Sequence, residues 1–370
     1  MDRIILHVDV NNAFLSWSAV DMLKNGYKED IRYKCAIIGG DESQRRGIVL
    51  AKSFPCKKKG VITGESIYSA RRKCPYLEVY KPSYEVYRKY SNLMYNYLCT
   101  YSNIIERYSI DECFLDYTNS QKLFGDPVKV AYKIKSDIKR MFGFTVNVGV
   151  GNNKLLAKMA SDFSKPDKVH TLFSYEVEKK MWPLDVADLF MIGKSSAKRL
   201  KELNINTIYD LAHSDINYLT KYFKSMGKMM WEYANGIDES AVEYKKRDAK
   251  SISSSTVLPY NYTNKDDIYK VFKMLSMDVG KNCINTDEDI YKSATMLFDL
   301  IWNNEKVRAL CVDISDFTAH SEVQLDIFNA NNQSILKNDD KKLQGVMDSI
   351  RSKYGNNAIG YADSIKSNRK

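Results

Sequence analysis

The sequence lacks the features that mark a membrane or secreted protein. No apolar run in its 370 residues is long enough to cross a bilayer. The N-terminus leads into an apolar stretch that is interrupted at His7 and Asp9, and this stretch is too short for a signal peptide. We therefore expect a cytoplasmic protein.

Cysteine and histidine are sparse and scattered. The seven cysteines stand at positions 35, 56, 74, 99, 113, 283 and 311, and no two of them form a Cys-x-x-Cys pair. The four histidines are also dispersed. This distribution predicts reduced thiols in a cytosolic protein and argues against a zinc site.

Apolar and basic residues are plentiful. A hydrophobic content of 44% supports a substantial core, and the length suits two or three domains. The net charge is +10, and residues 45–73 hold nine Lys or Arg against one acid, Glu65. Such a stretch is often a solvated face, but its concentration here favours a polyanionic partner such as nucleic acid or nucleotide phosphate.

The periodicity predicts an α+β multidomain protein, with a palm of antiparallel strands backed by helices. Strands are expected at 1–10, 33–38, 47–51, 144–149, 291–300 and 307–315, and helices at 12–24, 66–73, 83–102, 127–141, from 152, 265–284 and 339–354. Residues 25–75 form an inserted lobe. Residues 167–236 are helical, and 241–255 read as a basic, serine-rich tether.

Three acids stand at the ends of predicted strands. Asp111 and Glu112 are adjacent, and Asp9 ends the apolar run Ile4–Asp9. Neighbouring carboxylates repel each other, so a cation should hold them. Together the three would form an all-oxygen cage that suits Mg²⁺ or Mn²⁺ and serves phosphoryl or nucleotidyl transfer. Two unrelated surface turns remain the alternative.

Four sequence blocks resemble the Y-family DNA polymerases, the DinB/UmuC group of lesion-bypass enzymes. They are His7–Phe14, Val49–Val61, Ser109–Glu112 and Val148–Asp167. The resemblance implies a right-handed, template-directed DNA polymerase of translesion synthesis and the SOS response. Its implied parts are a palm (1–24 and 76–168), fingers (25–75), a thumb (169–238), a linker (239–251), an α/β little finger (252–360) and a tail (361–370).

The resemblance also implies roles at the active site. Asp9, Asp111 and Glu112 would bind two Mg²⁺ ions, helped by the Val10 carbonyl. Phe14 would be the steric gate against ribonucleotides, unless it only packs on the first helix. The residues matched to the triphosphate site are Phe54, Lys57 and Lys165, with Lys58, Lys59, Lys154 and Lys158 as weaker candidates. A lysine suits that place because its ammonium can follow phosphate charge onto the leaving group.

Some positions depart from the DinB pattern. Asn11, Ala51 and Lys57 resemble the UmuC branch more closely. Ala51 and Phe54 lack the hydroxyl groups that would bond phosphate oxygens, which leaves their part in triphosphate binding open.

Other segments resemble DNA- and clamp-binding parts. The run 189–200 is similar to a helix-hairpin-helix, with Met191 where the first glycine is usual; a plain helix start is the alternative. The implied DNA contacts are Gly193, Lys194, Ser195, Lys245, Lys246, Arg247 and Lys250, although the last four also suit a solvated linker. The peptide resembling a sliding-clamp motif comprises Gln324, Leu325, Asp326, Ile327 and Phe328.

The implied partners are primer-template DNA, dNTP and the sliding clamp, bound by a monomer. Two other functions compete with this interpretation. One is a nucleotidyl cyclase on a similar palm, which would need no thumb or basic tether. The other is a DNA- and clamp-associated repair factor with an idle site, which would not need the three acids.

Overall fold

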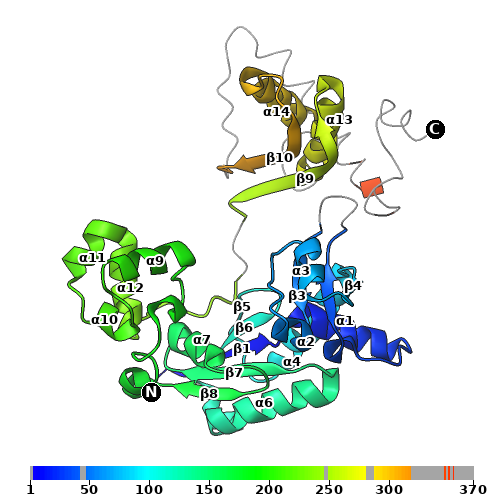
Figure 1. The fold of residues 1–370 in the computed structure, drawn as a ribbon. Helices are drawn as coiled ribbons and strands as arrows, with labels where there is room; N and C mark the ends of the chain where they lie inside the picture. Colours follow the sequence, from blue (N-terminus) through cyan, green and yellow to red (C-terminus); the bar gives the residue numbers. More distant parts are fainter. Residues whose placement is uncertain are drawn as a thin grey trace. The chain divides into compact units, whose positions relative to one another are not determined.

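The computed structural model describes residues 3–41, 47–245, 249–280 and 287–317, together with 346, 349, 350 and 353. The chain divides into two compact units, 1–42 with 47–246, and 43–46 with 247–370 (Figure 1). No helix in the described part of the chain is long and apolar enough to cross a membrane.

A five-stranded sheet organises the first unit. Its order is β5 (Ile105–Arg107), β6 (Glu112–Asp116), β1 (Ile5–Val10), β7 (Val146–Gly151) and β8 (Val169–Leu172). β1 is antiparallel to both β6 and β7, whereas β8 is parallel to β7. The expected all-antiparallel palm sheet is therefore wrong at one edge. The crossover helix α7 (Lys154–Asp162) returns the chain so that β8 runs in the direction of β7.

The two faces of β1 meet different surroundings because successive side chains point to opposite sides of a strand. Leu6, Val8 and Val10 belong to the largest core, which α1 (Ala13–Lys24), α4 (Tyr84–Leu98) and α6 (Pro127–Phe142) complete. Ile5, His7 and Asp9 alternate with them and lie on the face that α7 covers (Figure 1). The catalytic candidate Asp9 thus lies between the sheet and α7.

Two glycines allow α7 to lie directly on the sheet. A Cβ atom at Gly149 would meet the Ala157 carbonyl oxygen at 1.9 Å, and one at Gly151 would meet the Ala157 nitrogen at 2.8 Å. Only a residue without a side chain fits there, so the Gly-Val-Gly run of β7 sets how closely the helix approaches the acids.

A smaller sheet lies in the segment expected as a separate lobe. β2 (Ala36–Gly39) is antiparallel to β3 (Val49–Lys52) and parallel to β4 (Glu78–Tyr80). The short helices η1 (Ile31–Tyr33), α2 (Phe54–Lys58) and α3 (Ile67–Lys73) accompany it. Because β4 pairs with β2, this sheet extends beyond the expected boundary at residue 75.

The segment after β8 is helical, as predicted. Its elements are η3 (Ser174–Glu176), α8 (Val177–Lys180), η4 (Val186–Asp188), α9 (Lys194–Glu202), α10 (Ile208–Ala212), α11 (Ile216–Phe223) and α12 (Ser225–Ala234). They share a core with α7, whose Leu156 and Met159 are buried among them. The short α5 (Gln121–Phe124) precedes α6.

The second unit corrects two predictions. Residues 291–300 were expected as a strand but lie in α14 (Asp287–Ile301), where Ile290 and Phe298 are buried eight residues apart on one helical face. The ten residues mix apolar and polar side chains and are too few for their periodicity to separate a helix from a strand. The tether ends before residue 255, because β9 begins at Ser251 (Ser251–Tyr262).

The remaining described elements of this unit are α13 (Lys265–Gly280) and β10 (Val307–Ser315), which pairs antiparallel with β9. Strand β10 matches the strand predicted at 307–315, and α13 begins at residue 265, as predicted for the helix 265–284. The clamp-like peptide 324–328 lies outside the described residues, as does most of the helix expected at 339–354.

Candidate active site

The antiparallel pairing of β1 and β6 brings the acids of the two strands together. Asp9 is the register partner of Glu112, and the Val10 N–H donates to the Asp111 carbonyl oxygen over 3.1 Å. The Asp111 side chain accepts a hydrogen bond from the Ser109 hydroxyl over 2.7 Å. Residues separated by about a hundred positions thus form one polar cluster.

Two lysines neutralise this cluster. The Lys158 Nζ lies 2.8 Å from Glu112 and 3.8 Å from Asp9. Lys165 forms an ion pair with Asp9, and its Nζ lies 2.8 Å from Asp162. Asp162 also faces Lys158 across 3.4 Å. The cationic groups that the adjacent acids required come from α7 and from the loop that follows it.

A buried histidine supports Glu112 from the interior. His7 Nε2 lies 3.8 Å from a Glu112 oxygen, and its Nδ1 is hydrogen bonded to the Ser161 hydroxyl over 2.8 Å. Neither His7 nor Ser161 was singled out from the sequence. The alternation of Ile4–Asp9 carried the signal, because it places His7 and Asp9 on the same face.

Burial and charge act in opposite directions on the ionisable groups. Burial raises the pKa of Asp9 above its ordinary value, although Lys165 and Lys158 oppose it. Burial would also raise the pKa of Glu112, but the nearby His7 ring and the hydrogen bond and charge of Lys158 outweigh it and lower that pKa to about 2. Burial lowers the pKa of His7. The site therefore keeps Glu112 ionised and His7 neutral near pH 7.

The loop that carries Lys165 is anchored by Asn147, another residue that sequence reasoning missed. The buried Asn147 amide donates to the carbonyls of Ser161 and Ser164 over 2.8 and 2.6 Å. Its oxygen accepts from the Asn11 amide over 3.1 Å. Asn147 is also the register partner of Asp9, so the same strand pair orients both the acid and the loop above it.

The donors in this cluster fit a hard divalent cation. Asp9, Asp111 and Glu112 offer carboxylate oxygens at neighbouring strand ends, and Val10 adds a backbone carbonyl at the end of β1. Oxygen donors of this kind are preferred by Mg²⁺ and Mn²⁺. A bound cation would neutralise the charge that Lys158 and Lys165 neutralise in this structure.

The nucleotide-site candidates occupy two places. Phe14, in α1, is half-buried and stacks on Tyr87 with ring centroids 4.7 Å apart, so packing against α4 accounts for one side of its ring. Phe54 and Lys57 are exposed on α2. The start of α1 is linked to β3, the strand before α2, because the Asn12 side-chain amide donates a hydrogen bond to the Lys52 carbonyl over 2.9 Å.

The weaker lysine candidates differ in their surroundings. The Lys154 Nζ is paired with Glu106, on β5, at 2.7 Å. The Lys58 Nζ lies 4.8 Å from the centre of the Phe54 ring, and Lys59 is exposed. Lys158 is the only one of the four with a described contact to Asp9 or Glu112.

The helix-hairpin-helix candidate has an unusual backbone where the sequence departs from the pattern. Met191 has φ of +71°, in the left-handed region that favours glycine. The turn thus keeps a glycine-like conformation without the glycine. Gly193 is the N-cap of α9, and Gly193, Lys194 and Ser195 are exposed. Lys245 and Lys250 are also exposed, whereas Lys246 and Arg247 lie outside the described residues.

An acid cluster of this kind, set on a sheet and bordered by lysines, is typical of metal-dependent phosphoryl or nucleotidyl transferases. Residues 8–162 match the family described as IMS, impB/mucB/samB. The chain is 44% identical to the DNA polymerase IV of Clostridium acetobutylicum, covering 97% of each chain, and 33% identical to that of Acetivibrio thermocellus, covering 96% of each. The chain belongs to the Y family of DNA polymerases.

Solved structures agree with this assignment. A Y-family polymerase chimera, Dbh-Dpo4(243-245)-Dbh, matches with a TM-score of 0.74 at 25% identity over 86% of this chain and all of that one. A structure titled "Insertion ternary complex of Dbh DNA polymerase" matches with a TM-score of 0.61 at 25% identity over the same shares. The predicted family, the α+β fold and the predicted activity, translesion synthesis by a DNA-directed DNA polymerase, are confirmed.

The comparisons favour a different branch from the one indicated by Asn11, Ala51 and Lys57. The relatives are named DNA polymerase IV, and a matching structure is titled as DinB. Similarity along nearly the whole chain outweighs the identity of three side chains. Nothing in the comparisons supports the cyclase or the idle repair factor.

Proposed function

We propose that Asp9, Asp111 and Glu112 are the catalytic carboxylates of this polymerase and that they hold two Mg²⁺ ions. The pairing of Asp9 with Glu112 in register, beneath Lys158 and Lys165, is the observation that supports this proposal most strongly. Mg²⁺ bound there would acidify the primer 3′-OH and neutralise charge on the triphosphate. Mn²⁺ is the alternative ion for the same oxygen donors.

The residues of this chain contribute orientation and charge. His7 and Lys158 keep Glu112 ionised and fix the direction of its carboxylate. Lys165 is half-exposed on the loop above Asp9, which places its ammonium at the edge of the cluster. With a divalent ion held by the acids, Lys165 would be free to pair with the leaving pyrophosphate.

Lys57 is the second proposed triphosphate ligand. Its ammonium is exposed on α2 and has no ion-pair partner among the residues that the structure describes. Phe54, one turn earlier on α2, would contact the nucleotide through its ring. Lys57→Met should raise the KM for dNTP more than it lowers kcat, since a lysine that binds the ground state and the transition state alike affects KM first.

Phe14 is proposed as the steric gate. Stacking on Tyr87 fixes the plane of its ring, while the remaining exposed side stays available to a sugar. A rigid ring in that position would leave no room for a ribose 2′-OH.

The domain roles remain part of this proposal. Residues 1–24 and 76–168 would be the palm, 25–75 the fingers, 169–238 the thumb, 239–251 the linker and 252–360 the little finger. Gly193, Lys194 and Ser195 would bind a DNA phosphate through backbone N–H groups at the start of α9. Lys245, Lys246, Arg247 and Lys250 would meet the duplex backbone, and their substitution should reduce the salt dependence of DNA binding.

The remaining partners are proposed from sequence. The peptide Gln324, Leu325, Asp326, Ile327 and Phe328 would dock on the sliding clamp, with the polymerase acting as a monomer in the cytoplasm during the SOS response. Deleting 324–328 should remove clamp-stimulated synthesis but leave synthesis without the clamp unchanged. Unchanged stimulation would exclude this role.

Primer extension tests the central proposal. With Mg²⁺, primer and a defined template, the protein should extend past an abasic site as well as along an undamaged strand. Extension without a template, or none at all in the intact protein, would contradict it.

A further inference from the structure

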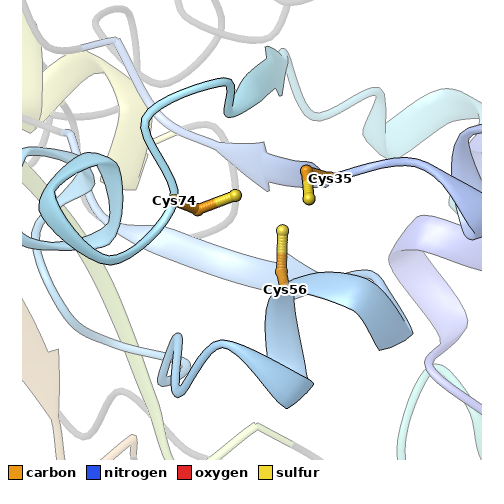
Figure 2. A group of neighbouring side chains, drawn as sticks. All are labelled: Cys35, Cys56 and Cys74. Carbon is orange, nitrogen blue, oxygen red and sulfur yellow. The ribbon is translucent and has the colours of Figure 1, made fainter.

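Three cysteines that are far apart in the sequence converge in the small sheet unit. The sulfur atoms of Cys35, Cys56 and Cys74 all lie within 4.8 Å of one another, and Figure 2 shows their side chains pointing into the same space. Cys35 precedes β2, Cys56 lies in α2, and Cys74 follows α3. The scattered spacing of the cysteines in the sequence gives no sign of this convergence.

The backbone holds each cysteine in place. The Ser53 hydroxyl accepts hydrogen bonds from the N–H groups of Cys56 and Ala36, over 3.3 and 3.2 Å. The Cys35 carbonyl accepts from the Glu78 N–H over 2.9 Å. The Cys74 N–H donates to Ala70 over 2.9 Å. The three sulfurs are therefore positioned by independent elements before any ligand binds.

Packing alone would also explain buried cysteines, because a free cysteine behaves as a small apolar side chain. Cys56 and Cys74 are fully buried in a core with Ile37, Val49, Val61, Ile67, Ala70 and Leu77. In such a core a sulfur can contact aliphatic groups on all sides. Here the three sulfurs instead face one another, and Cys35 is only half-buried, which gives the group a route to solvent.

We propose that Cys35, Cys56 and Cys74 bind one thiophilic metal ion, of the Zn²⁺ or Cu⁺ class, as three thiolates. Three thiolates around one ion with metal–sulfur distances of about 2.3 Å place the sulfurs roughly 4 Å apart, which lies within the observed limit. Thiolate ligands prefer soft ions, so this site should bind Mg²⁺ and Mn²⁺ poorly. Cu⁺ is satisfied by three thiolates, whereas Zn²⁺ would take a water as its fourth ligand.

The metal ion must displace thiol protons to bind. Burial raises the pKa of the Cys74 thiol to about 11 and also raises that of Cys56, which opposes thiolate formation at these two sulfurs and makes metal binding stronger as the pH rises. Binding releases three S–H protons to solvent, and no redox step is involved. The Lys59 ammonium favours the Cys74 thiolate and offsets part of the negative charge of the loaded site.

A bound ion would tie the start of β2 to α2 and to the end of α3. On the side of the cysteines, the small sheet packs on a core of eight buried side chains in the described residues, two of them Cys56 and Cys74, while its other side packs against α1. A core this small gains most from an additional link, as in other small metal-stabilised domains. Metal loading should therefore stabilise this unit and leave the five-stranded sheet unchanged.

Metal titration of the reduced, metal-free full-length protein tests the proposal. Zn²⁺ and Cu⁺ are titrated separately against a competing chromophoric chelator, and Cd²⁺ is used as a probe of thiolate coordination by ultraviolet charge-transfer absorbance. We expect one equivalent bound, the Cd²⁺ band, and a higher Tm. Cys56→Ser or Cys74→Ser should weaken binding at least about 100-fold, since even the loss of an outer-shell partner costs 10–100-fold.

Two controls separate this site from adventitious binding. Cys99→Ser and Cys311→Ser remove exposed thiols and should leave the stoichiometry unchanged. If the buried variants misfold, Cys35 serves instead: in the folded protein it should react with an alkylating reagent when metal-free and be protected when loaded. Absence of one-equivalent binding, binding lost only in the Cys99 or Cys311 variant, or formation of a disulfide within the trio without metal uptake would overturn the proposal.

Discussion

The Nζ atom of Lys158, on α7, lies 2.8 Å from the Oε1 atom of Glu112, on β6. Both side chains are mostly buried, with exposed fractions of 11% and 18%. The same ammonium lies 3.8 Å from Asp9. A single cation thus holds two like charges side by side, which is the task that we assign to a divalent ion during catalysis.

Removal of Lys158 should make the stability of the folded protein depend on a bound divalent ion. Lys158→Met leaves Asp9 and Glu112 without their shared counter-ion, and we expect a loss of about 3 kcal/mol in unfolding free energy in metal-free buffer. Millimolar Mg²⁺ should recover much of this loss, because it binds the folded acids. Urea denaturation with and without Mg²⁺ measures both effects.

Lys228→Met is the matched control, since its partner Glu232 lies 3.6 Å away on an exposed helix face. Its effect should stay below about 0.5 kcal/mol and should not respond to Mg²⁺. A Lys158 variant whose stability ignores Mg²⁺ would contradict a metal site at these acids.

The carboxylates should be needed for extension and not for DNA binding. Asp111→Asn keeps the size and the hydrogen bond from Ser109 but removes the charge, and we expect kcat to fall by roughly 10²–10³-fold or more. Steady-state extension and DNA-binding anisotropy measure the two properties. Asp116→Asn, at the far end of β6, is the control and should extend normally. Normal extension by Asp111→Asn would remove this residue from the catalytic set.

Ionised Glu112 should stabilise the folded protein, and the unfolding free energy should therefore fall at acidic pH. Its folded pKa of about 2 lies below the ordinary value of 4.5, so its stabilisation is fully present above pH 4.5 and is lost as the pH falls towards 2. The shift corresponds to about 3 kcal/mol. Asp9 acts in the opposite direction: because burial raises its pKa, protonation of Asp9 at acidic pH favours the folded protein.

Glu112→Gln should therefore flatten the fall in unfolding free energy between pH 4.5 and 2. Denaturant titrations at several pH values measure it, with the exposed Glu202→Gln as control. If the unfolding free energy of Glu112→Gln fell between pH 4.5 and 2 as steeply as that of the unmodified protein, His7 and Lys158 would not stabilise the ionised carboxylate.

Adding a single methyl group between α7 and the sheet, at Gly149 of β7, should destabilise the protein. Gly149→Ala forces the helix away from β7, because the new Cβ would lie 1.9 Å from the Ala157 oxygen. We expect a loss of about 3 kcal/mol or more in unfolding free energy. Gly193→Ala has no atom within 4 Å of its Cβ and should cost at most about 1 kcal/mol. Equal effects of the two substitutions would refute the close-packing argument.

Phe14→Ala should admit ribonucleotides. Without the ring that stacks on Tyr87, a 2′-OH meets no obstacle, and the ratio of kcat/KM for dNTP over NTP should fall by at least about 100-fold. Single-nucleotide insertion with dCTP and CTP opposite guanine measures the ratio. Leu93→Ala, a partly exposed position on α4, is the control. An unchanged ratio would assign Phe14 to packing alone.

Local sequence predicted much of the helical and strand content. Period-2 alternation located β1 and β6, and a proline at the first turn located the start of α6. The strand expected at 291–300 was wrong because ten residues of mixed apolar and polar character are too few for their periodicity to separate a helix from a strand. The parallel β8 was missed, since only the crossover through α7 determines its direction.

The sequence by itself determined which residues are available: three acids at strand ends, an aromatic five positions after the first acid, and lysines in two basic blocks. Tertiary structure decided which of them meet. Lys158 reaches Glu112 because Gly149 and Gly151 let α7 lie against β7. Cys35, Cys56 and Cys74 converge because β2, α2 and α3 pack around one small core. Contacts between residues far apart in the chain depend on packing, which no local pattern encodes.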